Sequence, residues 1–389
     1  MKLKLFVFAF LFTFFSNFAQ QRQLSPDAQI TVLTIGPGNS LNDAFGHNGF
    51  RVKDRNLGID VVYGYGAYDF EAPNFYLKFA QGKLNYLISK HYFKDFYFAY
   101  KEDNRTIDEQ ILNLSTEEKQ KLFNYLENNY KPENRRYLYD FFYDNCATRI
   151  RDITLKVSER KIDFKLPENF KPKTFRTLIH DHVDLNTWGS FGIDIALGSV
   201  IDRTATVNEH MFLPQYIHTF FETATLNNTE NLVKSSSTLY EKKETDSSLN
   251  ILFSPLIIIG LISLCILFFT YKDYKNNTRS NWLDITIFGT TGAIGVIILF
   301  LWFLTDHSAT AQNYNLLWAF PLNIIVIGQL LKPKIKNWVK RYLKFLIIML
   351  ALMTFHWLGG VQVFAIGLIP LLVALLVRYV FLIQFFNKN

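Results

Sequence analysis

The chain has 389 residues, 49% of them hydrophobic, and its 41 Lys and Arg exceed its 34 Asp and Glu, which gives a net charge of +7. This composition excludes a disordered protein and a collagen-like fibre. Most of the charge lies in residues 20–249, whereas long apolar runs dominate residues 250–389. The sequence therefore predicts a soluble domain followed by a membrane domain. Because many basic residues lie in short loops between apolar runs, they indicate membrane topology rather than nucleic-acid binding.

The first 19 residues have the pattern of a secretory signal. Lys2 and Lys4 precede an apolar run that is short for a membrane span, and the small residue Ala19 is suited to cleavage. We expect cleavage after Ala19, and an uncleaved N-terminal anchor is the alternative. In both cases residues 20–249 are exported from the cytoplasm.

The last third of the chain contains five apolar stretches about long enough to cross a bilayer as helices, the fourth only marginally. They are Ile251–Tyr271, Ile285–Thr305, Tyr314–Leu331, Leu343–Trp357 and Val361–Val377. The loops 272–284 and 332–344 and the C-terminal tail from Arg378 hold eleven Lys or Arg, whereas the loops 306–313 and 357–361 hold none. By the positive-inside rule we expect a cytoplasmic C-terminus and a multi-pass protein whose N-terminal domain lies outside.

Strands are predicted in the first part of the exported domain. Runs of β-branched and aromatic residues alternate with Gly and Pro, which predicts strands near 30–35, 49–52 and 60–65. Farther along, Ser115 and Glu118 have the spacing of a capping box. They predict a helix over residues 115–129.

A second helix is predicted to begin at or near Cys146, because Asn145 is a good N-cap residue and the next residues have helical periodicity. The exported domain is thus expected to have an α+β fold over residues 20–226. The polar segment 227–250 contains a run of Ser and mixed charge, which predicts a linker to the membrane domain at 251–389.

Cys146 is the candidate nucleophile. The second cysteine, Cys265, lies in the first apolar stretch, so Cys146 has no disulfide partner in the exported domain. A helix N-terminus favours the thiolate and offers N–H groups to an oxyanion. A small buried side chain without chemistry is the alternative. Arg149 and Arg151 are candidates for substrate binding, with a solvated helix face as the alternative.

His47 is the candidate general base, since a thiol nucleophile needs a base within hydrogen-bond reach. It lies between Gly46 and Gly49 at the start of a strand-like run, and a polar His in a turn is the alternative. His180 and His182 form an H-x-H pair without further clustered ligands, which is a weak metal signal. The sequence contains neither a phosphate-binding loop motif nor an H-E-x-x-H motif, so we expect no cofactor.

A Gly-His box on a strand followed by an Asn-Cys box at a helix start resembles the circularly permuted NlpC-type papain-like fold of the lecithin:retinol acyltransferase group. In that group a third polar residue on the next strand orients the His. Asp60, thirteen residues after His47, occupies the comparable place here. Tyr63 and Tyr65 are the alternatives.

The chain is still more similar to the Lnb lipoprotein N-acyltransferases, in which an exported domain of this kind precedes five transmembrane helices. The matching stretches are AFGHNGFRV (44–52), VVYGYGAYDFEAPNFYLKFAQGKLNY (61–86), EQILNLSTEEKQKL (109–122), PENRRYLYDFFYDNCATRIRD (132–152), WGSFGIDIALGSVIDR (188–203) and MFLP (211–214). The resemblance implies a periplasmic catalytic domain on a bacterial inner membrane. It also implies a phospholipid acyl donor, a thioester on Cys146, and a diacylated lipoprotein as the acceptor.

Two other functions are compatible with the same residues. A membrane-anchored cell-wall peptidase or amidase would use Cys146 and His47 on a peptide bond, in a polar groove that tolerates the loss of residues 250–389. A binding module without chemistry would keep Cys146 merely buried. Acyl transfer needs a site that admits lipid and excludes water, which five helices would help to provide.

His307 and His356 are expected on the exported side of the membrane domain. They belong either to a polar rim that receives substrates or to an ordinary belt of residues at the membrane interface.

Overall fold

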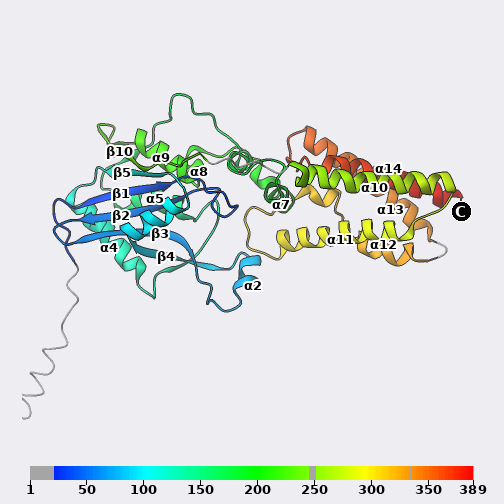
Figure 1. Cartoon of the computed structure of the whole chain (residues 1–389), viewed down its shortest axis with the longest axis horizontal. Helices are drawn as coiled ribbons and strands as arrows, with labels where there is room; N and C mark the ends of the chain where they lie inside the picture. The colour runs from blue at the N-terminus through cyan, green and yellow to red at the C-terminus, as the bar shows by residue number, and fades with distance from the viewer. Residues whose placement is uncertain (1–21, 245–250, 333–334, 389) are drawn as a thin grey trace, which may run out of the picture.

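The fold is that of a computed structural model, which describes residues 22–244, 251–332 and 335–388 (Figure 1). The expected signal at 1–19 lies outside these residues. Figure 1 shows a domain of strands and helices at one end and a bundle of long helices at the other. The α+β domain and the helical domain expected from the sequence are therefore both present.

A seven-stranded antiparallel sheet forms the centre of the N-terminal domain, in the order β10-β5-β1-β2-β3-β4-β6. Its strands are β1 (Gln29–Ile35), β2 (His47–Asp54), β3 (Ile59–Tyr68), β4 (Asn85–Tyr92), β5 (Ile107–Leu112), β6 (Arg136–Leu138) and β10 (Val233–Tyr240). The first three confirm the strands predicted near residues 30, 49 and 60. A smaller sheet joins β7 (Ile162–Asp163), β8 (Thr225–Leu226) and β9 (Glu230–Asn231).

Helices cover both faces of the large sheet, so β1 is buried along nearly its whole length. The helices of this domain are α2 (Phe75–Ala80), α3 (Phe93–Glu102), α4 (Thr116–Tyr130), α5 (Cys146–Val157), α6 (Phe175–His180), α7 (Trp188–Ala196), α8 (Val207–His210) and α9 (Pro214–Thr223). The main core lies between the sheet and α4, α5 and α9. The predicted capping box is confirmed at α4, where Ser115 Oγ accepts from Glu118 N and Glu118 accepts from Ser115 N.

The expectation of a linker over 227–250 is wrong for residues 233–240. They form β10, the edge strand of the large sheet, which pairs with β5. Five consecutive residues of β10, from Lys234 to Thr238, are exposed. An edge strand needs only main-chain hydrogen bonds on one side, so a polar, Ser-rich sequence can occupy it. Residues 245–250 lie outside the described part of the chain.

The membrane domain contains four helices that are long and apolar enough to span a bilayer, counted over the described residues. They are α10 (Pro255–Asn276), α11 (Asn281–Phe303), α13 (Asn337–Leu358) and α14 (Leu368–Lys388). The predicted third span, 314–331, is interrupted. It consists of a 3-10 turn, η3 (Tyr314–Leu317), and a short helix, α12 (Asn323–Leu330), with Pro321 between them.

A polar cluster packs α12 against its neighbours. Asn323 Nδ2 donates to Thr291 Oγ1 of α11 at 2.8 Å, and Tyr342 of α13 donates to Asn323 Oδ1 at 2.6 Å. These contacts satisfy polar groups that lipid cannot satisfy. These hydrogen bonds hold α12 inside the bundle although the third apolar segment is too interrupted to form one long helix.

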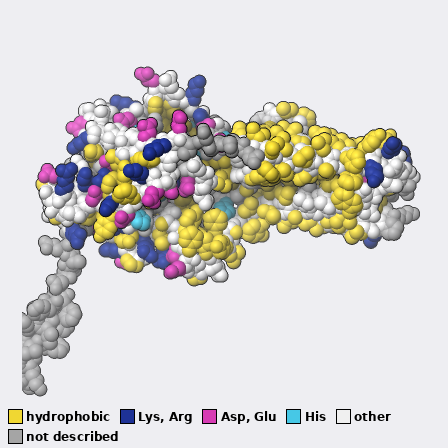
Figure 2. Space-filling view, viewed as in Figure 1, with side chains coloured by type: hydrophobic (Ala, Val, Ile, Leu, Met, Phe, Trp, Pro, Cys, Tyr) yellow, Lys and Arg dark blue, Asp and Glu magenta, His cyan; other side chains and the backbone are white. Residues whose placement is uncertain are grey.

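Basic side chains gather at the end of the bundle that is remote from the sheet domain (Figure 2). Arg378, which the sequence analysis assigned to the C-terminal tail, lies elsewhere. Arg378 lies within α14, is fully buried, and donates to Asp273 and Asp284 at 2.7 Å each. The last helix begins at Leu368 rather than at Val361, which moves Arg378 from the tail into the bundle.

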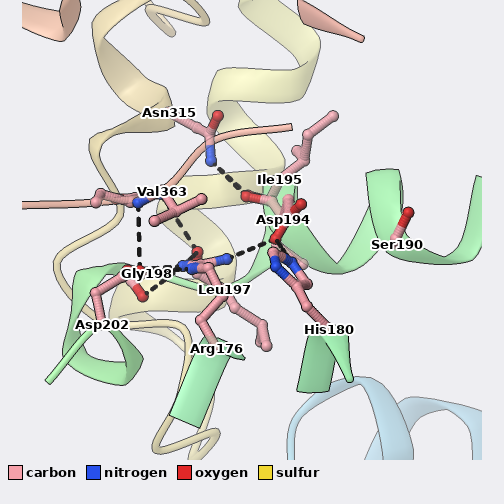
Figure 3. A network of polar contacts seen from close by, with 12 residues as sticks. Arg176, His180, Ser190, Asp194, Ile195, Leu197, Gly198, Asp202, Asn315 and Val363 are labelled. Atoms are coloured by element: carbon pink, nitrogen blue, oxygen red, sulfur yellow. Dashed lines mark hydrogen bonds and ion pairs between the residues drawn. The ribbon is translucent and has the colours of Figure 1, made fainter. Parts of the chain in front are cut away.

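A buried polar network joins the two domains (Figure 3). Arg176 of α6 donates to Asp194 of α7 at 2.8 Å and to Asp202 at 2.8 and 3.0 Å. From the membrane domain, Asn315 Nδ2 donates to the carbonyl of Asp194 at 2.8 Å, and Val363 N donates to Asp202 Oδ1 at 3.3 Å. The sheet domain is thus held in a fixed position over the helices.

Candidate active site

Cys146 is the first residue of α5, as the sequence predicted. The side chain of the N-cap residue, Asn145, is buried, and its Oδ1 accepts from the N–H groups of Ala147 and Thr148 at 2.9 Å. Its Nδ2 donates to the carbonyls of Phe141 and Phe212 at 2.7 and 2.8 Å. The start of α5 is therefore rigid, and the N–H of Cys146, which the cap does not engage, contacts the Cys146 sulfur.

His47 is the first residue of β2 and follows a glycine that the backbone requires. Gly46 has φ +79°, and a Cβ at this position would lie 2.5 Å from the carbonyl oxygen of Ile35. Another residue would be strained and would clash with β1. The Gly-His box thus directs the chain from the preceding loop into β2 with the imidazole at the end of the sheet.

One cavity of about 330 Å³ brings Cys146 and His47 together. Tyr100 and Arg105 also line it. The N–H of Asn48, the residue after His47, hydrogen-bonds to the Cys146 sulfur. The thiol therefore lies beside the start of β2, next to the candidate base.

Both candidate catalytic groups are neutral in this environment at pH 7. Burial raises the pKa of the Cys146 thiol to about 11, although backbone N–H groups and the positive charge of Arg105 oppose this shift. Burial lowers the pKa of His47 to about 4, and the charges of Arg105 and His91 act in the same direction. The resting pair is thus a thiol and an imidazole, so a base-assisted attack fits better than a preformed ion pair.

Arg105 is a site residue that the sequence analysis missed. Its side chain is 5% exposed, Nε donates to the carbonyl of Gly36 at 3.0 Å, and Nη1 lies 3.5 Å from Asp43 Oδ1. Nη2 is buried without a hydrogen-bond partner. No local motif marks this residue, because it reaches the cavity from the loop after α3, far from both boxes in sequence.

Asp60 does not orient His47. It forms a bidentate ion pair with Arg51 at 2.7 and 2.8 Å, and it pairs in register with Lys53. Lys53 is six residues from His47 along β2, roughly 20 Å at the rise of a strand. The sequence position of Asp60 resembles that of the residue that orients the His in the related group. The register of the β2–β3 hairpin, however, places Asp60 at the end of β2 away from His47.

The two tyrosines offered as alternatives have other partners. Tyr63 donates its hydroxyl to Glu127, and Tyr65 donates to Asn129 Oδ1 at 2.6 Å, both on α4. Tyr65 also lines the Cys146 cavity. The ring stacked nearest to His47 among the described contacts is that of Tyr100, with centroids 6.3 Å apart.

Arg149 and Arg151 lie outside the cavity. Arg149 forms an ion pair with Asp144, and its guanidinium carbon lies 4.4 Å from the centroid of the Tyr137 ring. Arg151 donates to Asp152 and to the carbonyl of Asn208, both at 2.7 Å. Neither residue lines the space beside Cys146, so the expectation that they bind substrate there is not supported.

A second cavity, of about 430 Å³ and largely apolar, adjoins the first. The two cavities share six residues, which form the boundary between them: Asn42, Phe45, Tyr68, Tyr86, Tyr139 and Phe141. Residues 306–310, in the loop after α11, also line the second cavity. Membrane-domain residues therefore help to build an apolar space next to the cavity that holds Cys146.

Four other histidines, His180, His182, His307 and His356, have structural partners. His307 is part of the loop that lines the apolar cavity, and its Nε2 lies 3.2 Å from the carbonyl of Ala80. His356 packs against the ring of Tyr314, with centroids 4.5 Å apart. His180 hydrogen-bonds to Asp194 at 2.9 Å and belongs to the network between the domains, and His182 contacts the carbonyl of Leu178 at 2.8 Å.

Two family models match the chain. The Lnb N-terminal periplasmic domain matches residues 15–181, and the Lnb transmembrane domain matches residues 244–389. The chain belongs to the Lnb family. Membership of the Lnb family indicates an enzyme of lipoprotein maturation with a periplasmic domain and a transmembrane domain. No curated protein and no solved structure matches the chain.

Proposed function

We propose that the protein is a lipoprotein N-acyltransferase with Cys146 as nucleophile and His47 as general base and acid. The observation that carries the proposal is the adjacency of two cavities: the space beside Cys146 shares part of its wall with an apolar cavity lined partly by the membrane domain. A lipid acyl chain in the apolar cavity would present its ester carbonyl to the thiol. A peptidase would have no use for that second cavity.

The first half-reaction forms a thioester. A ring nitrogen of His47 takes the thiol proton while the Cys146 sulfur attacks the ester carbonyl carbon of a phospholipid. The oxyanion of the tetrahedral intermediate lies at the start of α5 and accepts from the N–H of Cys146, which the Asn145 cap does not engage. The bond from carbon to the glycerol oxygen then breaks, His47 returns the proton to that oxygen, and a lysophospholipid leaves.

The second half-reaction forms the amide. The α-amino group of a diacylglyceryl-Cys lipoprotein attacks the thioester carbonyl, and His47 takes a proton from the amine. The carbon–sulfur bond breaks, and the proton passes from His47 to the sulfur, which regenerates the Cys146 thiol. The positive charge of Arg105 favours the transient thiolate in both steps, and the same charge disfavours protonated His47, which speeds the return of its proton.

The arrangement also supports a permuted papain-like assignment for the periplasmic domain. A strand that begins at His47 lies beside a helix that begins at Cys146, and the strand precedes the helix in sequence. We further propose that the protein lies in a bacterial inner membrane, with the sheet domain in the periplasm and the basic end of the bundle in the cytoplasm. The positive-inside rule supports this orientation.

Mass spectrometry of a diacylated lipopeptide tests the proposal. The peptide is incubated in phospholipid vesicles with purified full-length protein, with Cys146→Ala, or with the control Cys265→Ala, which alters the exposed cysteine of α10. We expect one added acyl group on the peptide amine with the wild type and with Cys265→Ala only. Equal gain with Cys146→Ala would remove this residue from the mechanism. No gain with folded wild-type protein would contradict acyl transfer and favour a test on cell-wall peptides.

A further inference from the structure

The segment around α2 exposes a group of large apolar side chains, which we call the α2 patch. Its members and their exposed fractions are Phe70 (71%), Tyr76 (83%), Leu77 (56%) and Phe79 (48%). No residue of α2 is buried. Figure 2 shows hydrophobic side chains gathered over this helix. A contiguous apolar patch of this kind on a folded domain marks an interaction surface.

Hydrogen bonds place the α2 patch at the end of a membrane helix. Asp306 N donates to the carbonyl of Gln81 at 2.8 Å, and His307 Nε2 lies 3.2 Å from the carbonyl of Ala80. Helix α11 ends at Phe303, only three residues before Asp306. Figure 1 likewise shows α2 beside the loop that leaves α11. Because α11 is long and apolar enough to span a bilayer, the α2 patch lies at the level where this helix is expected to leave the bilayer.

The composition of this region matches the interface of a bilayer. Tyr is enriched at that depth because it combines an apolar ring with a polar hydroxyl, and Phe70, Leu77 and Phe79 supply apolar surface that can enter the acyl region. Lys78 lies within α2, and Lys83 follows it with its side chain 52% exposed. Lys83 is 4.0 Å from Asp306, and Glu71 is the exposed acid before the helix. Two lysines beside a group of aromatic residues suit lipid headgroups with acyl chains beneath them.

The α2 patch also borders the apolar cavity. Phe79 belongs to both, and Tyr68, Gly82 and Leu84 continue the cavity wall on either side of the helix. Apolar surface thus continues from the bundle end, over α2, to the apolar cavity, which shares part of its wall with the Cys146 cavity.

We propose that the α2 patch inserts into the outer leaflet of the bilayer, on the exported side, and forms the entrance through which a lipid acyl chain reaches the apolar cavity. The insertion follows from the placement of α2 alone. The entrance role rests on the proposed acyl transfer. The two parts are therefore tested by separate measurements.

Insertion is tested by fluorescence in the full-length protein. Tyr76→Cys is made in a Cys146→Ala, Cys265→Ser background, labelled with an environment-sensitive dye, and reconstituted in vesicles of phosphatidylethanolamine and phosphatidylglycerol. The control is Leu57→Cys, which is 46% exposed in the β2–β3 turn at the sheet end away from His47. We expect a blue shift and quenching by nitroxide-labelled lipid at position 76 and neither at position 57. Aqueous emission without quenching at position 76 would overturn the proposal.

The entrance role is tested by comparing two acyl donors. Tyr76→Glu with Leu77→Glu should slow transfer from vesicle phospholipid at least fivefold relative to acylation of Cys146 by a soluble short-chain ester. Leu57→Glu should leave that ratio unchanged. An unchanged ratio in the double variant would overturn the entrance role. Failure of the soluble ester to acylate wild-type Cys146 would instead count against the proposed function, and the fluorescence result would stand.

Discussion

His47 Nε2 lies 3.0 Å from the point that a Cβ on Gly64 would occupy. Ser89 Oγ is 3.3 Å from the same point, and it donates to the carbonyl of Gly64 at 3.2 Å. The missing side chain on β3 therefore leaves room for the imidazole over the sheet. A glycine in the middle of a strand often marks such a close approach.

Gly64→Ala should displace the imidazole by a few tenths of an ångström and slow acyl transfer about tenfold, since catalysis is sensitive to small misplacements. Circular dichroism and thermal unfolding should change little. Gly192→Ala is the matched control, because a Cβ there meets nothing within 4 Å. Full activity in Gly64→Ala would show that the position of His47 does not limit transfer.

The reactivity of Cys146 toward iodoacetamide should rise steeply with pH. Burial raises its pKa to about 11, so only a small fraction is thiolate at neutral pH. The alkylation rate should therefore rise about tenfold per pH unit between pH 7 and 10. Intact-mass spectrometry follows the reaction, with Cys146→Ala to subtract alkylation of Cys265. A plateau that begins near pH 5 would instead reveal a preformed pair of thiolate and imidazolium.

Arg105→Met should slow alkylation of Cys146 several-fold at pH 8. The guanidinium lowers the pKa of the thiol by favouring its charged form, so removing it raises that pKa further. Arg105→Lys keeps a positive charge and should retain more of the wild-type rate. Equal slowing in both variants would indicate that the contacts of Arg105 with Gly36 and Asp43 matter more than its charge.

The network between the domains should be costly to break. Arg176→Met leaves Asp194 and Asp202 buried without their shared cation, which should destabilise the protein by about 3 kcal/mol or more. Arg203→Met is the control, because that arginine forms an exposed ion pair with Glu209. Thermal unfolding in detergent should show a large loss of Tm only for Arg176→Met. Similar small losses in both variants would mean that the network does not hold the domains together.

Local patterns in the sequence were sufficient for several features of the site. The N-cap at Asn145, the start of α5 at Cys146 and the capping box at Ser115 each depend on residues within one helical turn. Gly46 before His47 likewise reflects a local need for positive φ. Such features could be predicted because their causes lie within a few residues.

Features that depend on register or distant contacts could not be predicted in this way. The family resemblance suggested Asp60, thirteen residues after His47, as the residue that orients the imidazole, but the hairpin register places Asp60 at the far end of β2. Arg105 reaches the cavity from another loop, and Arg378 finds its carboxylates on two other helices. The polar sequence of β10 is typical of a linker, and only its main-chain pairing with the distant strand β5 makes it a strand.

The apolar cavity should determine which acyl chains are transferred. Ala309, in the loop after α11, lines this cavity and is half-buried, so Ala309→Phe should fill part of its volume. We expect transfer from a long-chain phospholipid to fall at least fivefold more than transfer from an eight-carbon analogue, because only the longer chain needs the lost space.

Ala351→Phe provides the matched control. The same change is made on an exposed position of α13, where an added ring meets lipid rather than the cavity. Lipopeptide products from the two donors are quantified by mass spectrometry in the same vesicles. If Ala309→Phe slowed both donors equally, the acyl chain would not occupy this cavity during transfer. A selective loss of the long chain would locate the chain between the sheet domain and the membrane helices.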